Sequence, residues 1–256
     1  MLTRSTLFVP LILLAMHATQ PFATADGGRR FAYTYAATTE AQGDIGLETW
    51  VTWKHHRGPG RVDEFDFRHE LEWGVTNRLT MGLYLANWNY TSTPEARGAH
   101  YDSSSLELIY GLTDPATSWL GTALYGEVTV GNTATELEAR LLLQKNLGRF
   151  TIAANVIVEA IWSGESLGHQ NQQDGEINES LGVSYRVNKH LSVGAELLNE
   201  SHLPDWGSPE KSFCSAGPNV TVRYKRSFAT LTTLFRMTNN PDEPNVQTRL
   251  IFGYEF

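Results

Sequence analysis

The sequence is poor in cysteine, in basic residues and in long apolar runs, and each shortage excludes a class of protein. Its one cysteine, Cys214, cannot form an internal disulfide, so no disulfide framework holds the fold. Lysine and arginine number 20 against 28 acidic residues, and the formal net charge of −8 argues against a general nucleic-acid binder, which needs a basic face. Beyond residue 25 no run of ~18 apolar residues occurs, so the sequence contains no candidate transmembrane helix.

The first 25 residues have the features of a secretory signal peptide. Arg4 supplies the positive start, residues 7–18 are mostly apolar, and Ala23-Thr24-Ala25 places small residues before a cut at Asp26. The apolar stretch is shorter than the ~20 residues of a membrane-spanning helix, although an uncleaved anchor helix is the alternative. We therefore expect an exported mature chain, either a periplasmic β protein or an outer-membrane barrel.

Alternation of apolar and polar residues favours the barrel. Between residues 64 and 75 the odd positions are Phe65, Phe67, His69, Leu71, Trp73 and Val75, and the even positions are Glu64, Asp66, Arg68, Glu70, Glu72 and Gly74. Successive side chains of a strand point to opposite faces, so one face of this strand is almost wholly apolar and the other is charged. A helix would scatter both sets around its circumference.

The same period of two recurs along the whole mature chain and predicts twelve strands. Many of them are longer than the ~5–6 residues usual in soluble proteins and suit the ~9–11 residues of a tilted membrane strand. The predicted strands are 45–53, 64–75, 79–87, 106–112, 120–132, 135–145, 150–162, 177–187, 191–199, 220–226, 228–237 and 246–256. The strand 228–237 is ambiguous because both of its faces carry apolar residues.

The connections between these strands alternate in length, which is typical of barrels with short periplasmic turns and longer extracellular loops. Short turns are expected at 76–78, 113–118, 146–149, 188–190 and 226–227, and longer loops at 91–102, 163–176, 202–216 and 238–245, with two tighter hairpins at 57–61 and 131–133. This pattern gives an antiparallel up-and-down barrel with both chain ends in the periplasm.

One stretch, residues 29–38, contains Phe31, Tyr33 and Tyr35 and could be a thirteenth strand. A thirteenth crossing would place the N-terminus outside the cell. We therefore divide the chain into a signal peptide (1–25), an N-terminal periplasmic or lumen-side segment (26–43) and the barrel (44–256).

Aromatic residues recur just before the short turns and near the chain end, and they predict a girdle at the periplasmic interface, where amphipathic rings prefer to lie. These residues are Trp73, Tyr110, Tyr185, Tyr224 and Tyr254.

Two further patterns carry a resemblance to a known group of proteins. The terminal Phe256, with Tyr254 and Phe252 on the same face, is similar to the C-terminal signal that the bacterial barrel-insertion machinery reads. The stretches 70–77 and 107–114 share a Glu-Leu strand that ends in Gly-(Val/Leu)-Thr-(Asn/Asp). Both resemble the uncharacterised porin-like outer-membrane β-barrel proteins of Gram-negative bacteria. The resemblance implies an outer-membrane location, with membrane lipid and the insertion machinery as partners, and it supplies no catalytic residues.

If the apolar faces meet lipid, the polar faces line the lumen. We predict the lumen-lining residues Glu48, Asp66, Arg68, Glu70, Glu72, Glu107, Glu127, Arg140, Glu159, Arg223, Lys225, Arg236 and Arg249. The last three strands are basic and the earlier ones acidic, so a transverse field would cross the lumen, and charged rings of this kind set pore selectivity. The sequence thus predicts a porin-like channel for passive passage of small polar solutes, without a cofactor or a dedicated metal site. Aromatics such as Trp50, Tyr84, Trp88, Tyr90 and Tyr125 are also expected on the lumen side.

Three alternatives stay open. The charged groups could pair with one another and fill a plugged, structural barrel. A hydrolase is the second, because Ser166 and His169 share one predicted loop, and His100 and Asp102 share another, but no nucleophile motif is present. The third is metal binding by loop histidines such as His55 and His56, which lack a ligand spacing beyond their adjacency.

Overall fold

The structure is a computed structural model that describes residues 29–57, 62–92, 97–240 and 243–256. The predicted signal peptide lies outside the described residues. Within them the chain forms twelve strands and a short 3-10 helix, η1 (Pro204–Trp206). The strands are β1 (Ile45–Arg57), β2 (Val62–Thr76), β3 (Leu79–Ser92), β4 (Arg97–Thr113), β5 (Gly121–Gly131), β6 (Ala134–Leu147), β7 (Phe150–Gly164), β8 (Gln170–Arg186), β9 (Leu191–Leu203), β10 (Phe213–Tyr224), β11 (Ser227–Arg236) and β12 (Val246–Glu255).

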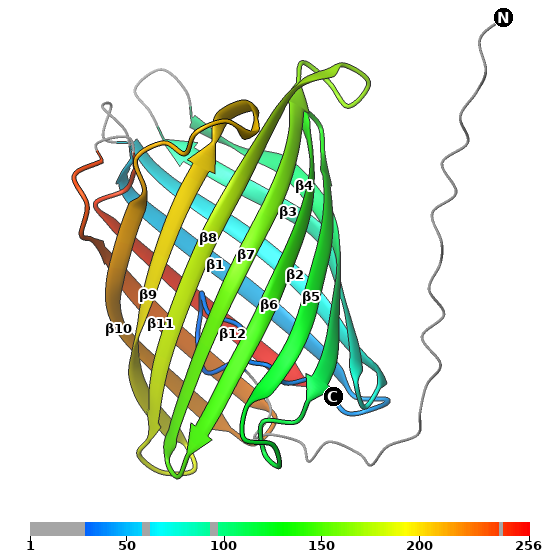
Figure 1. Ribbon diagram of the computed structural model, residues 1–256, viewed down its shortest axis with the longest axis vertical. Coiled ribbons are helices and arrows are strands. Elements are labelled where there is room, and N and C mark those ends of the chain that lie inside the picture. Colours follow the sequence, from blue (N-terminus) through cyan, green and yellow to red (C-terminus); the bar gives the residue numbers. More distant parts are fainter. Residues whose placement is uncertain (1–28, 58–61, 93–96, 241–242) are drawn as a thin grey trace, which may run out of the picture.

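The strands form a closed antiparallel barrel, which confirms the predicted fold (Figure 1). Each strand pairs with its neighbours in sequence, and β1 pairs with β12 from Gly46↔Glu255 to His55↔Val246, so the sheet has no free edge. Turns as short as the two residues Asn77-Arg78 lie at the end that carries Phe256, which we take as the periplasmic end. Among the described residues, no helix is long and apolar enough to span a bilayer.

The outer surface of the barrel is apolar, as the alternation predicts. Leu47, Leu71 and Leu83 from three adjacent strands point outward with 45%, 40% and 36% of their surface exposed. Burying one such side chain away from water is worth about 1.5–3 kcal/mol, so a surface built from many of them is stable only against hydrocarbon. The girdle residues Trp73 and Tyr224 lie near the periplasmic end and are 44% and 63% exposed.

A pair of irregularities between β2, β3 and β4 interrupts the alternation of inward and outward side chains. The register shifts between Phe67 and Glu70 on β2 and around Asn87 on β3. The inserted residue turns Asn87 to the lumen side, so Trp88 and Tyr90 pair directly with Phe67 and Phe65 of β2, although Trp88 also lines the lumen chamber described below. The Trp88 ring stacks on Phe67 with ring centroids 4.0 Å apart.

The same shift explains why the outer face of β2 carries a histidine. His69 Nδ1 lies 3.2 Å from the Thr49 hydroxyl, and the Trp88 indole N–H donates to His69 Nε2 at 3.4 Å. Both ring nitrogens are therefore satisfied within the outer surface, which lowers the cost of placing a polar ring in an apolar belt.

The strands extend further toward the extracellular end than the sequence predicts. β4 begins at Arg97 and β8 at Gln170, inside stretches expected to be loops, and β10 begins at Phe213. Backbone hydrogen bonding between neighbouring strands continues through polar residues there, because strand pairing does not need an apolar face beyond the membrane.

Candidate functional site

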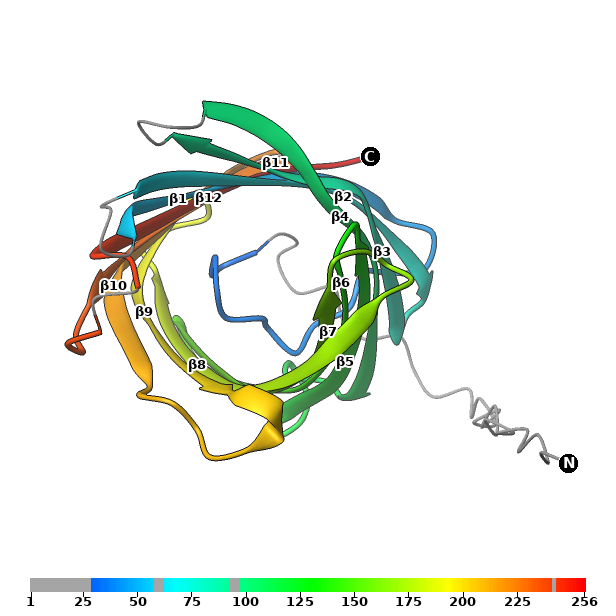
Figure 2. The same cartoon turned by 90° about the horizontal axis from the view of Figure 1, so that it is seen from above.

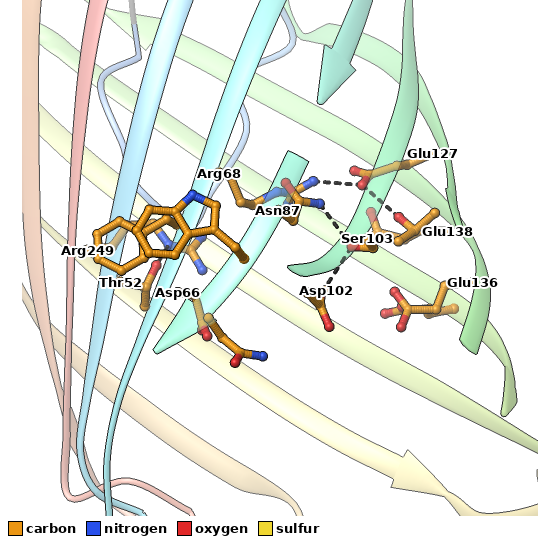
Figure 3. Close-up of a pocket in the computed structure, with 15 residues that line it drawn as sticks. Thr52, Asp66, Arg68, Asn87, Asp102, Ser103, Glu127, Glu136, Glu138 and Arg249 are labelled. Carbon is orange, nitrogen blue, oxygen red and sulfur yellow. Dashed lines mark hydrogen bonds and ion pairs between the residues drawn. The ribbon is translucent and has the colours of Figure 1, made fainter. Parts of the chain in front are cut away.

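The extracellular half of the lumen contains a chamber of about 270 Å³ (Figure 3). Acidic side chains dominate its walls, and they come from strands on opposite sides of the barrel. The charged residues that line it are Asp66, Arg68, Asp102, Glu127, Glu136, Glu138, Glu159 and Arg249, and Asn87, Ser103, Thr52 and Thr129 are among the uncharged ones.

A row of carboxylates winds along the wall and passes through this chamber. Residues directly opposite each other on paired strands point to the same face of the sheet. Following direct partners from strand to strand leads from the periplasmic end of β2 to the extracellular end of β8, with Gly82 as the one interruption. The members of this carboxylate row are Glu72, Glu107, Glu127, Glu138, Glu159 and Glu176.

The carboxylate row does not stabilise the barrel by itself, because like charges directly opposite one another are destabilising. Two arginines reduce the repulsion between the carboxylates in the middle of the row. Arg68 Nη2 lies 2.7 Å from Glu127 Oε1, and Arg140 binds the Glu138 carboxylate with both Nε and Nη2. Glu159 and Glu176 have no ion-pair partner within the described part of the chain. The outer end of the row is therefore a group of acids that no described lysine or arginine pairs with, and such a group can attract a cation.

The periplasmic half of the lumen is occupied by the N-terminal segment, which we define as residues 29–44. Viewed along the barrel, this segment crosses the interior rather than pairing as a strand (Figure 2). Phe31, Ala32, Tyr33, Tyr35 and Ala37 are 2–5% exposed. The stretch that could have been a thirteenth strand is thus a lumen segment.

Lumen side chains bind the backbone of the segment. The Glu196 carboxylate on β9 accepts hydrogen bonds from the backbone N–H groups of Ala32, Tyr33 and Thr34, at 2.8, 2.9 and 2.8 Å. On β7, Asn155 accepts from the Tyr35 N–H at 2.7 Å and donates to its carbonyl at 2.9 Å. These bonds replace the water that an extended chain would otherwise bind, so they hold the segment in one position.

More contacts of this kind continue along the segment. The Ala37 N–H donates to Gln144 Oε1 on β6 at 3.0 Å, and Arg249 on β12 donates to the Ala32 carbonyl at 3.1 Å. These anchoring roles could not be predicted from the sequence, because Glu196, Asn155 and Gln144 follow the ordinary polar alternation of their strands. Only the aromatic residues of the segment indicated that it would be buried.

Arg29 joins the segment to the acidic side of the lumen. Its Nε donates to Glu48 Oε2 at 2.6 Å, and its Nη2 lies 3.0 Å from Glu70 Oε2 and 3.3 Å from Glu72 Oε1. The guanidinium carbon also lies 4.3 Å from the centre of the Tyr35 ring, within cation–π range. Glu48, Glu70 and Glu72, which the sequence predicts as pore-lining groups, here bind the chain's own arginine.

Glu40 is an acid of the segment at the periplasmic end. Burial, with the nearby carboxylates of Glu255, Glu48 and Asp44, raises its pKa to about 7, and Arg29 opposes the shift. Docking of the segment thus places a carboxyl group among other acids, where its neutral form is favoured.

The predicted basic side of the lumen is only partly assembled. Arg249 lies in the wall, where its Nε donates to the Thr52 hydroxyl at 2.9 Å, while Arg223 pairs with Glu255 at 3.0 Å near the periplasmic end. Arg236 donates to the carbonyls of Asn240 and Glu243 in the loop before β12. Lys225 is exposed in the turn after β10, with φ 55°, because the strand ends one residue before it, so it does not line the lumen as predicted.

The other predicted residues, the acids together with Arg68 and Arg140, lie on inward-facing positions of their strands. Their role in solute passage stays a prediction.

The hydrolase and metal alternatives find limited geometric support. Ser166 Oγ lies 3.3 Å from His169 Nδ1 in an exposed loop, and no carboxylate among the described residues orients this histidine. His55 Nδ1 lies 2.8 Å from Asp63 Oδ1, which is a pair rather than a ligand set. Over residues 29–57, 62–92, 97–240 and 243–256, the side chains that converge closely enough to hold an ion are Glu70, Glu72 and Glu107.

Comparison with known proteins places the chain in a family. Residues 23–249 match a family of unknown function (DUF6662), and the chain belongs to that family. No curated protein matches the sequence.

Solved structures with the same architecture include the COG4313 outer membrane channel from Pseudomonas putida F1, at 12% identity and a TM-score of 0.65, with 86% of this chain and 98% of that chain covered. The NanC porin is similar at 10% identity and a TM-score of 0.56, with 83% and 98% covered. At these identities the likeness shows the fold alone. The fold is that of outer-membrane channels and porins, which agrees with the predicted resemblance and, together with the apolar exterior, with an outer-membrane location.

Proposed function

We propose that this barrel is a porin-like channel through which small polar solutes pass passively, with a preference for cations, and that its N-terminal segment closes the periplasmic half. The observation that carries the proposal is the carboxylate row, which runs past the chamber with unpaired acids at its extracellular end. A row of opposed carboxylates costs stability, and an acidic lumen is how cation-selective pores attract their solutes.

The extracellular chamber supports entry from outside. Its uncompensated acids, such as Glu136 and Glu159, would raise the local concentration of cations and exclude anions. Arg249 on the opposite wall would orient polar solutes between the two charges.

A plugged structural barrel is the second candidate, and the contacts of the N-terminal segment favour it. The two candidates differ in whether the segment leaves. The segment is held by hydrogen bonds, by the ion pairs of Arg29 and by three buried rings, Phe31, Tyr33 and Tyr35. In a gated channel a ligand or a change of conditions would release it, whereas a permanent plug would stay bound.

Single-channel recording across a lipid bilayer tests the proposal. Mature barrels in a potassium chloride gradient should show discrete openings and a reversal potential that indicates cation preference. The double substitution Glu138→Gln and Glu159→Gln should weaken this preference clearly, because it removes two acidic groups from the chamber wall.

Glu179→Gln is the matched control, since it removes a charge from an exposed position on the outer face of β8, where Asn199 donates to it at 2.8 Å. It should leave the reversal potential unchanged. Correctly folded barrels that never conduct, with or without residues 26–41, would refute the channel and leave the structural barrel.

A further inference from the structure

Three carboxylates converge at the periplasmic end of the carboxylate row. Glu70, Glu72 and Glu107 each offer an oxygen, and the three oxygens lie within 4.8 Å of one another. Glu70 and Glu107 have no exposed surface at all. Gly82, their neighbour on β3, leaves the space open, because a Cβ there would collide with Glu70 Oε1.

Two of these carboxylates each have an oxygen without a partner. Glu70 uses Oε2 to bind Arg29, and Glu107 uses Oε2 to accept from the hydroxyls of Tyr84 at 2.9 Å and Tyr35 at 3.2 Å. Oε1 of Glu70 and Oε1 of Glu107 are buried and have no hydrogen-bond partner among the residues that the structure describes. An unsatisfied buried carboxylate oxygen is costly, so its presence indicates a missing ligand.

The carboxylates around this cluster also outnumber the cationic side chains that bind them. Glu48, Glu70 and Glu72 share the single guanidinium of Arg29, and among the described residues Glu107 accepts from the neutral hydroxyls of Tyr35 and Tyr84. The nearest arginines of the wall, Arg68 and Arg140, are already bound to other members of the row. Buried anions need opposite charge close by, and a small ion can supply it where no side chain does.

From these observations we propose that Glu70, Glu72 and Glu107 bind a hard divalent cation of the calcium class. An all-oxygen, all-carboxylate set selects such ions over softer metals. Oxygens spaced by less than 4.8 Å can close on an ion at the ~2.3–2.6 Å that calcium prefers with small side-chain movements. Waters or neighbouring oxygens would complete the shell.

The ion would also lie next to the N-terminal segment when this segment occupies the lumen. Two residues of the N-terminal segment, Arg29 and Tyr35, bind the same carboxylates from the other side. The site therefore lies between the wall and the segment. Binding requires no passage of solute, so it can be measured in a barrel that carries no current, and its failure would leave the channel proposal standing.

Calcium titration of the refolded, metal-free mature barrel tests the site. Isothermal titration calorimetry should give one bound Ca²⁺ per barrel, and Glu107→Gln should weaken binding at least ~10-fold because it removes a ligand charge without touching the Arg29 ion pairs. Terbium should occupy the same site and show luminescence sensitised by Tyr84, whose hydroxyl donates to Glu107.

Glu159→Gln is the matched control, because it makes the same chemical change at a glutamate of the same row that lies outside the cluster. It should change the affinity less than ~3-fold, in keeping with a charge that touches no ligand. Heat-modifiable mobility on gels shows whether each variant is folded, and Glu70→Gln serves as a second ligand variant if Glu107→Gln is not. Absence of calcium and terbium binding, or equal losses in Glu107→Gln and Glu159→Gln, would overturn the site.

Discussion

Replacing Glu196 with alanine is expected to release the N-terminal segment and to raise the open fraction of the channel by about two orders of magnitude. The Glu196 carboxylate accepts hydrogen bonds from three backbone N–H groups of the segment, and within the described part of the chain it is their acceptor. A hydrogen bond to a charged group is worth about 1.5–3 kcal/mol, so even partial replacement by water should cost roughly 3 kcal/mol. At 1.4 kcal/mol for each factor of ten, this corresponds to ~10²-fold.

Two measurements follow the release. Single-channel recordings should show longer openings, and trypsin should cleave after Arg29 or Arg30, which contact the lumen residues Glu70 and Thr221 in the wild-type barrel. The substitution also removes a charge from the lumen, so a second variant must reach the same state in another way.

Gly182→Val is that second variant. A Cβ at Gly182 would lie 2.6 Å from the Phe31 ring, so a valine there excludes the segment sterically and leaves every lumen charge in place. Gly126→Ala is its control, because a Cβ at Gly126 meets only the Glu138 carbonyl at 3.9 Å. If Glu196→Ala and Gly182→Val both resist trypsin and conduct as the wild type does, the segment is not a gate.

Arg29→Ala should have the second large effect, because Glu48, Glu70 and Glu72 would lose their shared cation. Removing one partner of a buried ion pair costs about 3–5 kcal/mol when the remaining charge stays buried. We expect the docked state to be lost at neutral pH and calcium to bind more tightly, since the ion no longer competes with a guanidinium. Trypsin cleavage after Arg30 and calcium titration measure the two effects.

Arg29→Lys separates charge from shape in the same position. Lysine keeps the positive charge, but its ammonium group lacks the planar guanidinium that lets arginine bind three carboxylates at once. The trypsin resistance of Arg29→Lys should therefore fall between those of the wild type and Arg29→Ala. Calcium should also restore protease resistance to Arg29→Ala in part. Equal trypsin resistance in the wild type and in Arg29→Ala would contradict the proposed role of this arginine.

The sequence was sufficient to predict the barrel and to predict which face of each strand points toward lipid. Alternation along stretches such as 64–75 depends only on which side of each strand meets lipid, and that is a local property of the chain. Strand ends and bulges were less predictable. The shift that pairs Trp88 with Phe67 and turns Asn87 to the lumen arises from pairing among β2, β3 and β4, which no single strand encodes.

The candidate site was predictable as a set of acids but not as an arrangement. Glu107, Glu127 and Glu159 are visible as inward positions of their strands, yet their direct opposition depends on the register of several hairpins. The binding of residues 29–44 inside the lumen could not be derived either, because contacts such as Glu196 with Tyr33 join residues 163 positions apart. Lys225 was misplaced by one residue at a strand end, where predicted boundaries are least certain.

Both the gate and the calcium site require the N-terminal segment to lie inside the folded barrel in a membrane, and thiol labelling measures this directly. A Cys214→Ser, Ala32→Cys barrel in lipid vesicles carries one thiol at a position that is 2% exposed. A membrane-impermeant maleimide should label it at least ~100-fold more slowly than in the urea-unfolded chain, because labelling requires the segment to leave its site. Labelling at the unfolded rate would show that the segment is outside the lumen and would contradict the account.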